Sequence, residues 1–384
     1  MRFNRCIIAF GIIMVMLFGS SVFAQSIDVK AKSAILIDAS TGYVIFDKNA
    51  HEKVAPASIT KMMTLKLALE AIRDGKISKD DMVTVSKRAW EVGGSTMFLN
   101  VGDKVKVGDL LQGIAVASGN DACIAIAEHM SGSVDEFAQR MNQRAQSLGL
   151  KETHYENPHG LDAPNHYMSA HDIAMLARDS INSIPEILQY HSQPSFTYNG
   201  ITQQNRNPLL GNYPGADGLK TGMTDNAGYS LAGTAKQGDT RLIGVVMGEA
   251  NEEIRQEDMI KLLNHGFKNY ETATVLQQSQ PVGNQVPVRR GVSNTLEAVT
   301  ASPLVATIPK GELAKVEQKA ETVPDLTAPI AKGQKVGRVV AMYQGKEIGA
   351  VDLVAAKDVG KAGFLKSLWQ SIIDFFRGLV RFRS

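Results

Sequence analysis

The sequence predicts an α+β protein: an antiparallel sheet flanked by helices, then a smaller all-β domain, then a C-terminal amphipathic helix. Strand patterns stand at both ends of residues 25–271, with long helical patterns between them. The terminal strands are therefore expected to meet in one sheet on which the helices pack. From 272 to 358 short alternating runs replace the helical patterns. In the last segment, 359–384, apolar residues recur at three- and four-residue steps.

The first 24 residues are typical of a signal peptide. Arg2 and Arg5 precede the apolar run Cys6–Phe18, and the small-residue site Val22-Phe23-Ala24 follows. An uncleaved membrane anchor is the alternative, but the run is shorter than the ~20 residues that a span needs. We therefore expect the protein to be exported.

Composition sets further bounds. A chain of 384 residues with 44% hydrophobic residues can bury one large core and a smaller one. The formal net charge is +2, of which Arg2 and Arg5 carry two charges, so the mature chain is close to neutral. Without a basic tract there is no electrostatic footprint for nucleic acid. Cys123 is the one cysteine left after removal of the signal, so it cannot form an internal disulfide. Its apolar neighbours favour a buried residue over a reactive thiol.

Within residues 25–271 the elements follow from periodicity and turn residues. A hairpin is expected over 34–46, with its turn at Ser40-Thr41-Gly42, and a second hairpin over 229–247. Helices are expected over 59–73, 121–130 and 252–267.

The all-β unit, 272–358, contains no histidine or cysteine, which argues against a metal or nucleophile site there. Its strands are expected near 285–288, 304–308, 316–323, 336–343 and 347–354. In the tail, five basic residues from Lys361 onward oppose only Asp374, a net charge of +4. Such interleaved charges favour a helix lying in a lipid interface, with docking on the protein's own surface as the alternative.

Ser58 and Lys61 are the first candidate pair. Residues three apart share a helix face, so the Lys61 amine is expected near the Ser58 hydroxyl. Ser58 follows Pro56-Ala57 at the start of a helical pattern, where the helix dipole stabilises a developing alkoxide. A desolvated lysine can activate a serine as a nucleophile. The same pattern also fits an N-cap serine beside a surface lysine.

Lys220-Thr221-Gly222 is the second candidate and is expected on a strand ahead of the second hairpin. The lysine and threonine suit a carboxylate ligand, and Gly222 permits close approach of a substrate backbone. A strand end next to a turn is the alternative interpretation.

Ser118-Gly119-Asn120 is the third, in a loop between a buried run and a helix, where it can present a hydroxyl and an amide to a cleft. Ser180-Ile181-Asn182 has the same pattern but reads as a polar helix end, so Ser118 is preferred.

The three motifs in this order resemble the set found in class A β-lactamases and penicillin-binding proteins. Longer stretches carry the resemblance further: residues 55–64, 118–122, His159-Gly160-Leu161-Asp162 and 217–222. The sequence is similar to the low-molecular-mass penicillin-binding proteins, specifically the D-alanyl-D-alanine carboxypeptidases of the peptidase S11 family, over nearly the whole chain. The resemblance implies a β-lactamase/transpeptidase-like catalytic domain over 25–271.

The resemblance also implies residue roles. Ser58 would attack the carbonyl between the two D-alanines and become acylated, with Lys61 as general base. Ser118 would relay a proton to the leaving amine, and Asn120 would hold the substrate amide and position Lys61. His159 is expected to be structural rather than catalytic.

For binding, Lys220 and Thr221 would hold the terminal carboxylate, with Arg206 and Arg255 near it. Gly222 would line the substrate, and the backbone N–H groups of Ser58 and Met223 would form an oxyanion hole. Several relatives carry histidine where this chain has Met223, which puts any side-chain role in deacylation in doubt.

Peptidoglycan pentapeptides and β-lactam antibiotics are the partners implied, with a lipid surface bound through the tail and no metal or cofactor. The family analogy places the protein on the periplasmic face of the inner membrane. Three alternatives differ in function: a β-lactamase, whose deacylating Glu-x-x-Leu-Asn pattern is not found, a D,D-endopeptidase using the same residues, and a penicillin sensor that turns over little.

Overall fold

The computed structural model describes residues 27–283 and 285–363. The expected signal peptide, 1–24, and all but the first five residues of the expected tail, 359–384, lie outside the described residues. Among the described residues, no helix is both long enough and apolar enough to cross a membrane.

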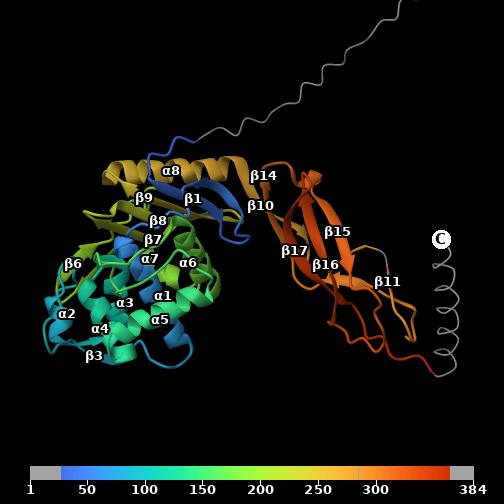
Figure 1. The fold of residues 1–384 in the computed structure, drawn as a ribbon, viewed down its shortest axis with the longest axis horizontal. Helices are drawn as coiled ribbons and strands as arrows, with labels where there is room; N and C mark the ends of the chain where they lie inside the picture. Colours follow the sequence, from blue (N-terminus) through green and yellow to red (C-terminus); the bar gives the residue numbers. More distant parts are fainter. Residues whose placement is uncertain (1–26, 284, 364–384) are drawn as a thin grey trace, which may run out of the picture.

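A five-stranded antiparallel sheet organises the first part of the chain (Figure 1). Its strands, in spatial order, are β2 (Val44–Lys48), β1 (Ser33–Asp38), β9 (Thr240–Glu249), β8 (Gly228–Gln237) and β7 (Ala216–Thr224). β1 pairs with β9, with Ser33 opposite Met247, so the first and last strands meet as the sequence predicts. β7 is an edge strand of this sheet.

Helices cover both faces of the sheet. α8 (Glu252–Asn269) lies along one face, and α6 (Ala170–Ser183) contacts β1 and β9 from the other, where the remaining helices gather (Figure 1). Those others are η1 (Ala57–Thr60), α1 (Lys61–Arg73), α2 (Lys87–Glu91), α3 (Val107–Gln112), η2 (Gly113–Ala117), α4 (Asn120–Ser131), α5 (Val134–Ser147) and α7 (Ile187–His191). Two small ribbons join them: β3 (Met82–Thr84) with β4 (Lys104–Lys106), and β5 (Ser195–Tyr198) with β6 (Ile201–Gln204).

A buried ionic network fixes α1 against its neighbours. Lys66, fully buried in α1, places its Nζ 2.9 Å from Glu70 Oε1 and 2.5 Å from Asp179 Oδ2 of α6. Arg144 of α5 reaches the same Glu70 oxygen at 2.6 Å. Since buried charges need partners, this network links α1 to α5 and α6. It therefore helps to fix the position of α1, whose first residue is Lys61.

The second part of the chain consists mainly of strands, as expected. β10 (Tyr270–Leu276) pairs with β14 (Leu304–Pro309), and β11 (Val286–Pro287) pairs with β12 (Thr295–Leu296). A further sheet has the order β13 (Ala298–Thr300), β17 (Lys346–Ala355), β16 (Lys335–Tyr343), β15 (Glu317–Thr322), and the short helix η3 spans Leu313–Lys315. These strands enclose their own apolar cluster. β10 follows α8 without an intervening residue and begins just before the expected boundary at 271/272.

Contacts hold the two parts together at that junction. Thr272 Oγ1 donates to the buried carboxylate of Asp38 at the end of β1, and its N–H donates to Thr240 Oγ1 at 2.8 Å. Thr41 and Thr307 share a hydrogen bond of 2.6 Å between their hydroxyls. The turn after β1 is therefore bonded directly to the strands that follow α8.

Candidate active site

Ser58 lies on the short 3-10 helix η1, and Lys61 is the first residue of α1. The Lys61 Nζ is 2.8 Å from the Ser58 Oγ. In a 3-10 turn the side chains of residues i and i+3 eclipse each other, which sets the amine directly over the hydroxyl. The sequence predicts an α-helix from 59, and the structure instead begins that helix at Lys61 after one tighter turn.

Lys61 is fully buried, and its second partner is a backbone atom. Its Nζ donates to the carbonyl of His159 at 2.6 Å. Burial, with a smaller contribution from the charge of Arg206, lowers the pKa of Lys61 to about 8. A substantial fraction of this amine is therefore neutral near pH 8 and can take the proton of the Ser58 hydroxyl.

The segment from Asn157 to Leu161 packs tightly against η1 and α1. Pro158 accepts a hydrogen bond of 2.6 Å from Thr64 Oγ1. Gly160 has φ +90°, and a Cβ there would lie 1.8 Å from the Ala57 carbonyl oxygen. Only glycine fits this approach, so Gly160 sets the position of the carbonyl that holds Lys61.

Ser118 and Asn120 lie at the corner between η2 and α4. Ser118 adopts the left-handed conformation, φ 60° and ψ 33°, which is uncommon for a residue with a side chain. Both residues are buried, and both η2 and α4 pack against α1. The Asn120 side-chain amide donates to the carbonyl of Gly93 at 2.7 Å, and its N–H donates to the carbonyl of Ser95 at 2.7 Å. That Asn120 positions Lys61 stays a prediction.

The rival motif has a different use. Ser180 Oγ donates to the carbonyl of Leu176 within α6 at 2.6 Å, and Asn182 donates to the carbonyl of Ala39 at 3.0 Å. These bonds stabilise the end of a helix and its contact with the sheet, which supports the preference for Ser118.

Lys220, Thr221 and Gly222 lie on the edge strand β7, which packs against η1. A Cβ at Gly222 would lie 2.8 Å from the Pro56 carbonyl oxygen and 3.2 Å from the Ala57 Cβ. The absence of a side chain there lets β7 approach the turn that carries Ser58.

Lys220 shares this buried region with Lys61. It is 3% exposed, its Nζ donates to the Thr221 carbonyl at 3.2 Å, and Thr221 is also buried. Burial, and then the charge of Lys61, hold the pKa of Lys220 well below its usual range. The structure thus places the Lys61 amine in contact with the Ser58 hydroxyl and near enough to Lys220 to lower its pKa.

Two arginines add positive charge to the same region. Arg206 is exposed, and its Nη1 donates to Ser95 Oγ at 2.9 Å. Arg255 of α8 is buried with its guanidinium 5.9 Å from the centre of the Tyr229 ring. Within the described part of the chain, its Nε has no hydrogen-bond partner. Both arginines lower the pKa of Lys220, so four basic side chains converge on a site suited to an anion.

Met223 follows Gly222 on β7, opposite Tyr229 of β8, and its side chain is 53% exposed. Met223 is therefore largely open to solvent, while its backbone continues the edge strand beside η1.

Two features of the site were not predicted from the sequence. The loop Gly93–Ser95 is held by Asn120 and Arg206, and Asp121 accepts backbone N–H groups of Met97 and Leu99 just beyond it. A glycine pair is the one local signal of this loop. The carbonyl of His159 is the other. Burial lowers the pKa of the His159 imidazole to about 3, and its structural role stays a prediction.

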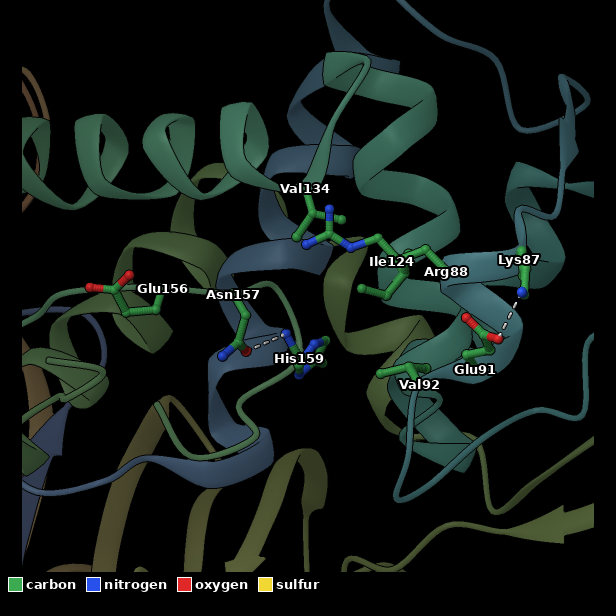
Figure 2. A pocket seen from close by; sticks show the side chains of 9 residues that line it. All are labelled: Lys87, Arg88, Glu91, Val92, Ile124, Val134, Glu156, Asn157 and His159. Atoms are coloured by element: carbon green, nitrogen blue, oxygen red, sulfur yellow. Dashed lines mark hydrogen bonds and ion pairs between the residues drawn. The ribbon is translucent and has the colours of Figure 1, made fainter. Parts of the chain in front are cut away.

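A pocket of about 410 Å³ opens beside this segment. Figure 2 shows side chains from α2, α4 and the 156–159 loop around it, with His159 among them. Its lining consists of Lys87, Arg88, Glu91, Val92, Ile124, Val134, Glu156, Asn157 and His159. Neither Ser58 nor Lys220 lines this pocket. His159 links the pocket to the candidate site, because its carbonyl accepts a hydrogen bond from Lys61.

Known proteins resemble this chain along most of its length. Residues 20–251 match the family model described as D-alanyl-D-alanine carboxypeptidase, and residues 270–361 match that of the penicillin-binding protein 5 C-terminal domain. The carboxypeptidase DacF of Bacillus subtilis is 38% identical over 94% of this chain and 96% of its own.

Solved structures agree. Penicillin-binding protein 5 of Haemophilus influenzae matches with a TM-score of 0.82 and 39% identity, over 88% of this chain and 99% of its own. Ampicillin-bound penicillin-binding protein D2 of Listeria monocytogenes matches with a TM-score of 0.59 and 30% identity, over 63% of this chain and 99% of its own. The chain belongs to the peptidase S11 family, the D-alanyl-D-alanine carboxypeptidases among the low-molecular-mass penicillin-binding proteins.

Proposed function

We propose that the protein is a serine D-alanyl-D-alanine carboxypeptidase that removes the terminal D-alanine from peptidoglycan pentapeptides. The observation that carries the proposal is the 2.8 Å contact between Lys61 Nζ and Ser58 Oγ, with the pKa of Lys61 lowered to about 8. A neutral lysine within hydrogen-bond distance is what a serine hydroxyl needs to act as a nucleophile.

The reaction would proceed in two steps. In the first, Lys61 takes the Ser58 proton as the oxygen bonds to the carbonyl carbon, the C–N bond to D-alanine breaks, and the leaving amine gains a proton through Ser118. In the second, water attacks the ester and releases Ser58 and the shortened peptide. The backbone N–H groups of Ser58 and Met223 would stabilise the oxyanion in both steps.

The terminal carboxylate of the substrate would bind among the cations. Lys220 and Thr221 would contact this carboxylate directly, and the positive charges of Arg206 and Arg255 would attract it from nearby. The lowered pKa of Lys220 supports this role, because an incoming anion would offset the repulsion that Lys61 and the two arginines exert on the charged form of Lys220. Gly222 would let the substrate backbone lie along the edge of β7, and Asn120 would hold its amide.

A β-lactam would acylate the same serine, since it presents a reactive carbonyl beside a carboxylate. The ampicillin-bound relative from Listeria monocytogenes supports this extension. Inhibition would follow from slow hydrolysis of the ester.

Release of free D-alanine from a pentapeptide ending in D-Ala-D-Ala tests the proposal. The wild-type protein should release D-alanine catalytically, and Ser58→Ala should release none. Stoichiometric acylation by penicillin without turnover of the peptide would instead favour a penicillin sensor. Cleavage of cross-linked dimers at a higher kcat/KM than pentapeptides would favour a D,D-endopeptidase.

We further propose that residues 1–24 direct export, that 25–271 form the catalytic domain, and that 272–358 form a structural all-β domain. The basic amphipathic tail, 359–384, would hold the protein to the periplasmic face of the membrane. Flotation with anionic lipid vesicles tests the tail: the full mature chain should float at low salt, and a chain ending at residue 363 should not. Equal flotation of both chains would remove the tail as the anchor.

A further inference from the structure

A group of two histidines and a glutamate lies outside the catalytic machinery. His51 follows β2, Glu152 precedes the 157–161 segment, and His171 is in the first turn of α6. One side-chain ligand atom of each lies within 4.8 Å of the others. His51 Nδ1 is 3.6 Å from Glu152 Oε2, and the two imidazole rings stack with their centres 4.5 Å apart.

A buried carboxylate orients one of these ligands. Asp172 is 1% exposed, and its Oδ1 lies 3.2 Å from His171 Nδ1. Its Oδ2 accepts the N–H of Glu152 at 2.7 Å and the Thr153 hydroxyl at 2.9 Å. An imidazole that donates from Nδ1 to a carboxylate keeps Nε2 free as a base, which is the arrangement that supports most metal-bound histidines. One aspartate therefore positions both His171 and the backbone that carries Glu152.

We propose that His51, Glu152 and His171 bind a divalent transition metal of the zinc class. Two imidazoles and one carboxylate are a donor set that Zn²⁺ prefers, with a fourth position left for water. Ligands about 2.0–2.1 Å from a tetrahedral ion lie roughly 3.3 Å apart, so the 3.6 Å separation of His51 and Glu152 is already close to that value. The His51 side chain is 60% exposed and is free to rotate inward to complete the site.

The site would connect the two chain segments that lead into the active site. His51 precedes Ser58 by seven residues, and Glu152 precedes His159 by seven. Backbone hydrogen bonds already join both segments to the start of α6 or to the residues just before it: His171 N–H donates to the Ala50 carbonyl at 2.8 Å, and His154 N–H donates to the Tyr167 carbonyl at 2.9 Å. A bound ion would add a cross-link at the surface end of this arrangement without touching substrate.

Calorimetric titration of metal-free, untagged full mature protein with ZnCl₂ tests the proposal. We expect one equivalent to bind, and we expect His51→Ala and His171→Ala each to raise the Kd at least tenfold. His154→Ala is the matched control, because His154 also lies 3.4 Å from a carboxylate, that of Glu156, and is similarly exposed. Its Kd should equal that of the wild type.

Binding of Co²⁺ can be followed by spectroscopy, independently of enzyme activity. The wild type and His154→Ala should show the visible absorption of four-coordinate Co²⁺, and His51→Ala should lose it. His51→Ala should keep the wild-type rate of acylation by penicillin without metal, which shows that it folds. Failure of the wild type to bind one equivalent, or undiminished binding by both His51→Ala and His171→Ala, would overturn the site and leave the proposed carboxypeptidase activity untouched.

Discussion

Raising the pH from 6 to 8 should accelerate acylation of Ser58 by penicillin, because the base that takes its proton must be neutral. With the pKa of Lys61 lowered to about 8, the neutral fraction is about 1% at pH 6, about 9% at pH 7 and about half at pH 8. The second-order rate constant should therefore rise about 50-fold over these two units and level off above pH 8. An ordinary lysine would still be gaining rate tenfold per unit at pH 9.

The assay is the rate of covalent labelling by a fluorescent penicillin, measured under pseudo-first-order conditions at each pH. Arg206→Gln supplies a second perturbation. Since the charge of Arg206 lowers the pKa of Lys61, its removal should move the midpoint of the profile to higher pH, whatever it does to the plateau.

Lys61→Ala is the control for identity of the base, and it should abolish labelling at neutral pH. A rate constant that stays flat or falls between pH 6 and 8 would refute the reasoning. Full labelling of Lys61→Ala would also remove Lys61 from the role.

Three further predictions concern stability, each measured as a free energy of unfolding from denaturant titration. Gly160→Ala should cost at least ~3 kcal/mol and lower acylation, because the added Cβ meets the Ala57 carbonyl at 1.8 Å; an unchanged free energy would contradict the close approach. Lys66→Met should cost roughly 3 kcal/mol, because it removes the buried cation beside Glu70 and Asp179 and leaves these carboxylates with the partly exposed Arg144; a neutral effect would mean that the network adds no stability. Burial raises the pKa of Glu249 from 4.5 to about 7, so the folded protein retains a proton that the unfolded chain loses, and its contribution to stability should fall as pH rises from about 4.5 to about 7. Glu249→Gln should flatten that decline, and an identical pH dependence in the variant would exclude Glu249 as its source.

Periodicity and turn residues predicted both hairpins and the helices α1, α4 and α8, since those signals are local, but no element was expected over α5. The hairpin at 34–46 and the strand pair that ends at Glu249 both form as expected, and their antiparallel union follows from burying one face of each strand. The tighter turn at Ser58 was not predicted. Its cause is tertiary: Gly160 and Gly222 press against Pro56 and Ala57, a contact that the local pattern does not encode.

In the candidate site too, some groups could be predicted from the sequence and others could not. Side chains with a chemical identity, such as Ser58, Lys61 and Lys220, could be named from their spacing. The His159 carbonyl could not, because a backbone oxygen has no residue-type signature. The partner of Asn120 was also missed, because the Gly93 carbonyl reaches it only when a loop from an earlier part of the chain folds over α4.

The junction at Tyr270 has a mechanical consequence. β10 starts where α8 stops, and the 2.6 Å contact of Thr41 with Thr307 joins the neighbouring strand β14 to the turn after β1. These connections restrict rotation of the strands beyond α8 relative to the five-stranded sheet. Ser58, the proposed nucleophile, is therefore held at a set distance and orientation relative to the strands of residues 272–358. A flexible Gly/Ser linker inserted after Asn269 would leave the residues of the candidate site in place. It would also let residues 25–271 move relative to the strands that follow, and so reach substrate over a wider range of distances.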